Sequence, residues 1–177
     1  MKLLLLLSLL SASDIIVQGD FKDTSGVTYT VDPTGVADST KAIQLAFSKA
    51  LWTNLEDSTK YVHAQSSPTI VFPSGTYKIS GQINAWPICA IVGSKAIIAQ
   101  TDPKATSFDF NGATDVTIKG MRFDGGACAV SIRNPNINGS VFVLEECRFD
   151  NIKGAAVLVK GSGDGNIMSA NLSLIRC

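Results

Sequence analysis

Several kinds of residue are scarce in this 177-residue chain, and each scarcity excludes a class of function. The 15 basic and 15 acidic side chains balance, so no excess of positive charge is available to attract nucleic acid or an anionic membrane. The only histidine is His63, and the four cysteines stand far apart, which argues against a zinc site built from nitrogen and sulfur ligands. We therefore expect no nucleic acid, no membrane partner for the mature chain and no transition metal.

What remains is the composition of an ordinary globular protein. Hydrophobic residues make up 45% of the chain and charged residues 17%, values that exclude a disordered polypeptide. The length suits one domain with a substantial core.

The first 13 residues have the pattern of a signal peptide. Met1 and Lys2 form a short basic start, residues 3–10 are an apolar run with one serine, and residues 11–13 are small, which suits cleavage after Ser13. The apolar run has eight residues, whereas a membrane-spanning helix needs about 20, so export is favoured over a permanent anchor. We expect a mature domain at residues 14–177 in an extracellular or periplasmic location.

Export changes how the cysteines and asparagines are interpreted. An oxidising compartment permits disulfides, and a eukaryotic host would also glycosylate the sequons that begin at Asn138 and Asn171. The cysteines are too few for a small fold held together by disulfides, and the sequence leaves their pairing open. They are Cys89, Cys128, Cys147 and Cys177.

One helix and many short strands are predicted. Residues 39–51 place apolar side chains at i, i+3, i+4, i+7 and i+8, which predicts an amphipathic helix with Asp38 as its N-cap. Residues 53–68 have no clear periodicity and are expected to form a surface loop. From residue 69 onward, short runs rich in Ile and Val alternate with Gly, Asn and Asp, and no second helix is predicted.

The later strands repeat one another, which indicates a solenoid. Residues 116–124 align with residues 142–150 at an offset of 26, and a third copy begins at Leu172. Residues 130–132 align with residues 157–159 at an offset of 27. A unit of about 26 residues without a helix is too short for a βαβ crossover, so we predict an all-β, single-stranded parallel β-helix in which each unit is one coil.

Equivalent strands in such a coil stack about 4.8 Å apart, and equivalent side chains form ladders. Alternation along each strand sends one set of side chains inward. The predicted inward pairs are Phe142 on Val116 and under Leu172, Leu144 on Ile118, and Phe149 on Phe123. Cys147 is expected between Met121 and Cys177, and the two cysteines form either a disulfide or a pair of packed thiols.

The two ends of the predicted coil are expected to differ. The helix at residues 39–51 is expected to cover the first coil with Ile43, Phe47 and Leu51. No covering element follows Leu174 in the sequence. We therefore expect the N-terminal part of a longer β-helix, a truncated product, or a chain whose open end is covered by another subunit, with self-association through the last coil.

Two segments resemble a known family. Residues 32–44, Asp-Pro-Thr-Gly-Val-Ala-Asp-Ser-Thr-Lys-Ala-Ile-Gln, resemble the segment that opens the pectate-lyase-like right-handed β-helix domains of rhamnogalacturonases, polygalacturonases and epimerase-like proteins. Residues 69–79, with Phe72-Pro73 and Gly75, are similar to the family's following strand. The resemblance covers about residues 20–177. It implies a right-handed β-helix with a capping helix and a secreted protein that acts on pectin-type polysaccharide.

The resemblance does not supply catalytic residues. Polygalacturonase-like members carry Asn-Thr-Asp, Asp-Asp, Gly-His-Gly and Arg-Ile-Lys motifs, and this sequence contains none of them. Lyase-like members bind calcium through clustered acidic residues, and the sequence has no dense acidic cluster. We expect no cofactor, with calcium only if the chain is lyase-like, and we expect the 177-residue chain to be inactive by itself.

Two aspartates are the catalytic candidates that the repeat itself provides. Asp124 and Asp150 occupy equivalent positions in successive coils, so their carboxylates are expected about 5 Å apart. That spacing is close to the ~5–5.5 Å separation of the two acids in retaining glycosidases. The alternative is that both side chains accept backbone amides in turns.

Two arginines are the substrate-binding candidates. Arg122 and Arg148 form a second outward ladder that suits the carboxylate of a uronate sugar. The alternative is pairing with neighbouring acids such as Glu145 or Glu146 on a solvated face. Three aromatic side chains suit either stacking on sugar rings or simple packing: Trp52, Tyr77 and Trp86.

Two functions of different classes therefore remain open. One is an extracellular glycoside hydrolase or polysaccharide lyase of pectin-type polysaccharide. The other is a non-catalytic β-helix, either an adhesin or a polysaccharide-binding module.

Overall fold

The structure is a computed structural model that describes residues 14–52, 69–85, 90–112, 115–133, 140–160 and 170–177. The expected signal peptide and the expected loop at residues 53–68 lie outside the described residues, as do Trp86, Cys89 and Asn138.

Helix α1 (Thr40–Trp52) confirms the predicted amphipathic helix. It begins one residue later than predicted, because the carbonyl of Ser39 accepts the first helical hydrogen bond, from the amide of Ile43 at 2.9 Å. The carboxylate of Asp38 accepts the amide of Thr40 at 2.8 Å and so satisfies a free donor at the helix start, as predicted, but the N-cap position itself is occupied by Ser39. No helix in the described part of the chain is long and apolar enough to cross a membrane.

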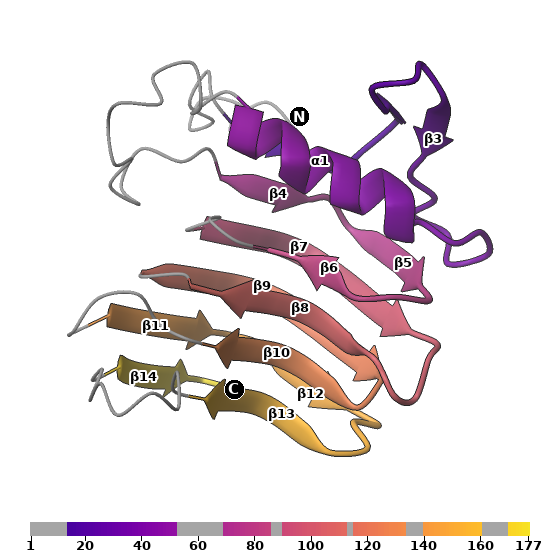
Figure 1. Cartoon of the computed structure of the whole chain (residues 1–177). Coiled ribbons are helices and arrows are strands. Elements are labelled where there is room, and N and C mark those ends of the chain that lie inside the picture. Colours follow the sequence, from indigo (N-terminus) through magenta and orange to yellow (C-terminus); the bar gives the residue numbers. More distant parts are fainter. Residues whose placement is uncertain (1–13, 53–68, 86–89, 113–114, 134–139, 161–169) are drawn as a thin grey trace, which may run out of the picture.

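Most of the described chain lies in two parallel sheets, with α1 lying at one end of the stack (Figure 1). The larger sheet contains β1 (Ile15–Ile16), β4 (Ile70–Phe72), β5 (Gly75–Ile79), β7 (Ala90–Gln100), β9 (Val116–Gly125), β11 (Ser140–Glu145), β12 (Arg148–Asp150) and β14 (Ala170–Ile175). The second sheet contains β6 (Ile83–Asn84), β8 (Thr106–Asn111), β10 (Cys128–Arg133) and β13 (Ala155–Lys160). An antiparallel hairpin of β2 (Asp20–Lys22) and β3 (Thr28–Thr30), which was not predicted, stands apart from both sheets.

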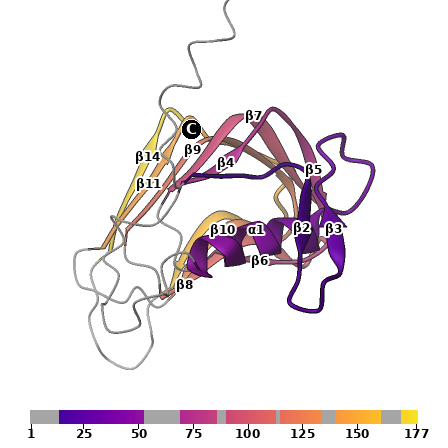
Figure 2. The same ribbon diagram turned by 90° about the horizontal axis from the view of Figure 1, so that it is seen from above.

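The chain alternates between the two sheets and moves one strand further along the stack at each return. Strands from successive returns therefore lie nearly over one another when the molecule is viewed from above (Figure 2). The predicted register is confirmed for these pairs: Phe142 with Val116 and Leu172, Leu144 with Ile118, Phe149 with Phe123, and Val157 with Val130. The expectation of an all-β fold with parallel strands and one short helix is confirmed.

Phenylalanine side chains fill the space between the sheets and under the helix. The ring of Phe108 lies 5.6 Å from that of Phe47, 6.1 Å from Phe72 and 5.4 Å from Phe123, measured between ring centroids. All four side chains are buried. Tyr77 belongs to the same core, and its hydroxyl donates to the carbonyl of Pro73 at 2.8 Å, so the packing role predicted as an alternative to sugar stacking is the one observed.

A residue with a left-handed backbone conformation recurs at equivalent positions along neighbouring strands of the larger sheet. Lys95, Gly120, Glu146 and Arg176 have φ angles of 59°, 67°, 54° and 52°. Gly120 is the one glycine among these four, because a Cβ there would lie 2.4 Å from the carbonyl oxygen of Gly93. The charged residues at these turns after β11 and β14, Glu146 and Arg176, are exposed.

The inward-facing side chains of β14 are less buried than those of the strands before it. Leu172 is 39% exposed and Leu174 is 54% exposed, whereas Phe142 and Leu144, their neighbours on β11, are buried. Among the described residues, β14 has a neighbour on only one side. The same ladder position is thus apolar and buried in one coil and apolar and exposed in the next.

Candidate functional site

The four predicted site residues come together on the outer face of β9 and β12. These strands pair in parallel, which places Arg148 beside Arg122. The same register places Asp150 beside Asp124. The inward side chain between each arginine and aspartate is a buried or half-buried phenylalanine, so the alternation of the strand itself turns the charged side chains outward. We call these four residues the Arg–Asp ladder.

Both carboxylates of the Arg–Asp ladder contact side chains of the ladder or of the next turn. Oδ2 of Asp150 lies 2.7 Å from Nε of Arg122 and 2.9 Å from Nε of Arg148. The contact with Arg122 is an ion pair without the alignment of a hydrogen bond, whereas Nε of Arg148 donates to Oδ1 of Asp150 at 3.0 Å. Oδ1 of Asp124 accepts a hydrogen bond from the side-chain amide (Nδ2) of Asn151 at 2.7 Å, and Oδ2 of Asp124 lies 3.6 Å from Nη2 of Arg122.

Exposure separates the two arginines of the ladder. The side chain of Arg148 is 70% exposed, whereas that of Arg122 is 38% exposed. Arg148 contacts Asp150 through Nε, and its terminal nitrogens form no ion pair or hydrogen bond with the described residues. The ladder therefore presents the outer edge of one guanidinium to the solvent, where an anionic group can reach it.

This arrangement is better suited to binding than to acid–base chemistry. A general acid or nucleophile must reach the reacting atoms of the substrate with its carboxyl oxygens. The carboxylates of Asp124 and Asp150 instead point toward Arg122, Arg148 and Asn151. Pairing of the arginines with acids is thus observed, and the partners are these two aspartates.

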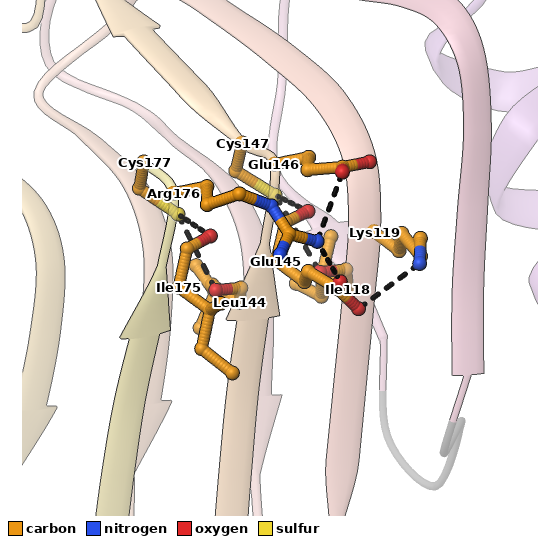
Figure 3. A network of polar contacts seen from close by, with 9 residues as sticks. All are labelled: Ile118, Lys119, Leu144, Glu145, Glu146, Cys147, Ile175, Arg176 and Cys177. Carbon is orange, nitrogen blue, oxygen red and sulfur yellow. Dashed lines mark hydrogen bonds and ion pairs between the residues drawn. The ribbon is translucent and has the colours of Figure 1, made fainter.

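The glutamates that were considered as partners of the arginines belong to a different cluster, shown in Figure 3. Oε2 of Glu145 accepts from Lys119 at 3.1 Å, and Arg176 contacts both Glu145 and Glu146, the latter at 2.9 Å. The hydrogen bond from Lys119 and the charge of Arg176 lower the pKa of Glu145 below its usual value. Arg122 and Arg148 therefore do pair with neighbouring acids, the alternative considered from the sequence, but with Asp124 and Asp150 and not with Glu145 or Glu146.

A second charged cluster, on the outer face of the second sheet, was not predicted. Asp109 of β8 is 3% exposed, and its two oxygens accept hydrogen bonds from Nε and Nη2 of Arg133 on the neighbouring strand β10, the first at 2.9 Å. Gln82 also donates to Asp109, at 3.2 Å. The hydrogen bonds and charge of Asp109 raise the pKa of Arg133. We call these three residues the Asp109 cluster.

The Asp109 cluster is connected to helix α1 through amide side chains. Gln82 donates to the side chain of Asn84 at 3.1 Å. Asn84 in turn exchanges two hydrogen bonds with Gln44 of α1, one to its backbone carbonyl at 3.1 Å and one from its backbone amide at 2.8 Å. The cluster therefore joins the helix to three strands of the second sheet.

Neither the Arg–Asp ladder nor the Asp109 cluster fits a calcium ion. Within the described part of the chain, no three His, Cys, Asp or Glu side chains are grouped so that they can hold a metal. In both clusters the carboxylates already face guanidinium groups, whose positive charge would repel a cation. The calcium that a lyase-like chemistry implies is not supported by these residues.

The remaining predicted positions are placed as follows. Asn171 lies on β14 and is exposed, so its sequon is accessible. Trp52 is the last residue of α1, and its side chain lies outside the described residues. Cys128, Cys147 and Cys177 are free thiols.

Comparison with known protein families gives a match over most of the chain. The family model described as "Rhamnogalacturonase A/epimerase, pectate lyase-like" matches residues 25–148, a span that includes α1, the Asp109 cluster, Arg122, Asp124 and Arg148. No curated protein and no solved structure matches the chain. The matched span covers most of the chain and the two segments whose sequence resembled this family. The chain therefore belongs to the pectate-lyase-like rhamnogalacturonase A/epimerase family.

Proposed function

We propose that this protein binds acidic, pectin-type polysaccharide outside the cell, and that the Arg–Asp ladder binds the uronate carboxylates. The family suggests a polysaccharide-acting protein. The observation that supports the binding role is the exposed guanidinium of Arg148, which stands beside that of Arg122 on a regular outer face. Guanidinium groups bind carboxylates through paired hydrogen bonds, and a ladder offers them at a repeating spacing.

We also propose the finer features of the fold that this function needs. The alternation between two parallel sheets supports a β-helix, and the strong preference for right-handed parallel crossovers supports a right-handed one. Helix α1 contacts β1, β4 and β6 and buries Ile43 and Phe47, which supports its role as the cap of the first coil. Removal of residues 1–13 as a signal peptide completes the proposal of an exported domain.

Binding of a charged oligosaccharide tests the role of the ladder. Oligogalacturonate is titrated into the wild-type protein and into the variants Arg148→Gln and Arg176→Gln. Arg176 is the matched control because it is also an exposed arginine paired with carboxylates, on a different turn. We expect about tenfold weaker binding for Arg148→Gln, the loss of one charge-assisted hydrogen bond, and little change for Arg176→Gln. Equal losses in both variants would indicate nonspecific attraction.

Hydrolysis or elimination is the second candidate function. It is favoured by family membership and by the adjacent positions of Asp124 and Asp150. We expect binding without turnover, because both carboxylates are occupied by neighbouring side chains. Release of reducing ends, and absorbance of unsaturated products, from pectin, rhamnogalacturonan and alginate tests this expectation. Turnover that is lost in both Asp124→Asn and Asp150→Asn would establish the enzyme instead.

A further inference from the structure

Cys147 and Cys177 occupy the same position in two successive coils. Glu145 at the end of β11 pairs with Ile175 at the end of β14, and each cysteine follows its strand by two residues. Each is also preceded by a residue in the left-handed conformation, so the two turns have the same shape. The two cysteines are therefore related by one step along the stack.

The hydrogen bonds of the two thiols repeat in the same way. The thiol of Cys147 lies 3.5 Å from two carbonyl oxygens to which it can donate. One belongs to Ile118 in the preceding coil, and the other belongs to Glu145. The thiol of Cys177 lies 3.3 Å from the carbonyl oxygen of Leu144 in the preceding coil and 3.5 Å from the carbonyl oxygen of Ile175. Figure 3 shows both side chains beside this backbone. The repeated contacts fix the two sulfur atoms in equivalent orientations.

The spacing of the coil fits a covalent link between these residues. Neighbouring parallel strands lie about 4.8 Å apart, and disulfides join residues whose Cα atoms are about 4.4–6.8 Å apart. Cys147 is buried and Cys177 is exposed, so one of the two thiols can be reached by an oxidant in solution. Cys128 lies on the second sheet, where its thiol donates to Val130 at 3.3 Å.

We propose that Cys147 and Cys177 form an intramolecular disulfide that ties β14 to the coil before it. A small-molecule disulfide such as oxidised glutathione is the oxidant. The thiolate of Cys177 attacks it, forming a mixed disulfide and releasing one glutathione thiolate. The thiolate of Cys147 then attacks the sulfur of Cys177 and releases the second. The two protein thiols lose two protons and two electrons, and the oxidant is reduced to two thiols.

The exposure of Cys177 decides which cysteine reacts first, and the burial of Cys147 decides how fast the second step is. Of the two cysteines, Cys177 is the one accessible to the oxidant, so it reacts first. Burial, together with the adjacent Cys177 thiol, raises the pKa of the Cys147 thiol to about 11. The thiolate of Cys147 is therefore scarce at neutral pH. We expect closure of the disulfide to become about tenfold faster for each unit of pH in the range below 11.

Mass spectrometry of the 177-residue chain tests the proposal. The reduced protein is incubated with oxidised glutathione, its free thiols are alkylated in denaturant, and its peptides are analysed without reduction. We expect a peptide pair linked through Cys147 and Cys177, with Cys128 alkylated. Links to Cys89 or Cys128, links between two chains, or unlinked Cys147 at every pH would overturn the proposal.

Two serine variants separate the chemical steps. Cys147→Ser is expected to stop at the glutathione adduct of Cys177, because no second thiol is present to displace it. Cys177→Ser is expected to leave Cys147 unmodified, because the oxidant cannot reach a buried thiol. Hydrogen exchange of residues 170–175 supplies a second readout: oxidation is expected to slow exchange in the wild type and not in Cys177→Ser. Modification of Cys147 in the absence of Cys177, or unchanged exchange in the linked protein, would contradict the proposal.

Discussion

Asp109 and Asp150 are both carboxylates held by arginines on outer faces of the sheets, but they differ in burial. Asp109 is 3% exposed and receives two hydrogen bonds from a single arginine, Arg133. Asp150 is 21% exposed and lies between two arginines, one of which is largely in solvent. Contact between an aspartate and an arginine therefore has a different consequence at each of the two sites. In the Asp109 cluster it fixes neighbouring elements, and in the Arg–Asp ladder it leaves a guanidinium edge available to a ligand.

The energetic difference follows from solvation. An exposed ion pair contributes about 0–1 kcal/mol, because water solvates both partners when the pair is broken. Removal of one partner from a buried pair is much more costly, because the remaining charge stays in the protein without compensation. Substitutions in the Asp109 cluster should therefore mainly lower stability, whereas substitutions in the Arg–Asp ladder should mainly change ligand binding.

The largest effect is expected from Arg133→Met. This change leaves the buried carboxylate of Asp109 with the amide of Gln82 as its remaining side-chain donor. We expect a loss of about 2–4 kcal/mol in the free energy of unfolding, below the full cost of a completely buried pair because Arg133 is half exposed. Equilibrium unfolding in urea measures this loss.

Arg148→Met is the matched control for that measurement. It makes the same substitution in an exposed ion pair, so we expect the free energy of unfolding to change by no more than about 0.5 kcal/mol. Equal changes in the two variants would show that burial does not distinguish the two clusters.

A smaller effect, a gain in ligand affinity, is expected at Asp150. Asp150→Asn removes the negative charge that lies between Arg122 and Arg148. Oligogalacturonate should then bind about two- to fivefold more tightly, because the ligand no longer competes with this carboxylate for the arginines. Titration calorimetry measures the affinity. Unchanged or weaker binding by a folded variant would argue that Asp150 itself contacts the ligand.

The smallest expected effect concerns a carboxylate held without arginines. Asp32 accepts the hydroxyl and amide of Thr34 and the amide of Ala37, and these hydrogen bonds lower its pKa to about 2. Since the folded-state pKa lies below the value of 3.8 for a free side chain, the stabilisation is present above pH 4 and is lost as the pH falls toward 2. Asp32→Asn should remove this part of the acid destabilisation. Parallel pH–stability curves for the two proteins would contradict it.

The repeated strands could be predicted well because their signal is local and periodic. The 26-residue offset between residues 116–124 and 142–150 fixes the register of β9 with β11 and β12. Alternation within each strand then decides which side chains are buried. The juxtaposition of Arg122 with Arg148 and of Asp124 with Asp150 followed from these two facts alone.

The contacts of those side chains could not be predicted from the repeat. Register places like residues side by side, but which carboxylate an arginine reaches depends on its rotamer and on diagonal neighbours. Arg122 thus contacts Asp150 of the next coil at 2.7 Å, a diagonal partner. Glu145 and Glu146 were the suggested partners, and they are near Arg148 in the chain but 23 and 24 residues from Arg122.

The Asp109 cluster was missed for a related reason. The alternation of residues 106–111 marks a strand with Asp109 on its outer face, a position usually exposed. Its partner Arg133 is 24 residues away, in the next coil, and is related to it diagonally. Extending the coil register back from residues 130–132 to β8 would have brought these residues together. Its burial would still have required knowledge of what covers the sheet.

Binding of oligogalacturonate and of its fully methyl-esterified form by the wild-type protein tests the central claim most directly. The two ligands have the same sugar backbone, but the ester lacks the carboxylate charge that the exposed guanidinium of Arg148 is proposed to bind. We predict at least about tenfold tighter binding of the charged form, with the difference reduced in Arg148→Gln and retained in Arg176→Gln. Equal affinity of the wild-type protein for the two ligands would contradict the account.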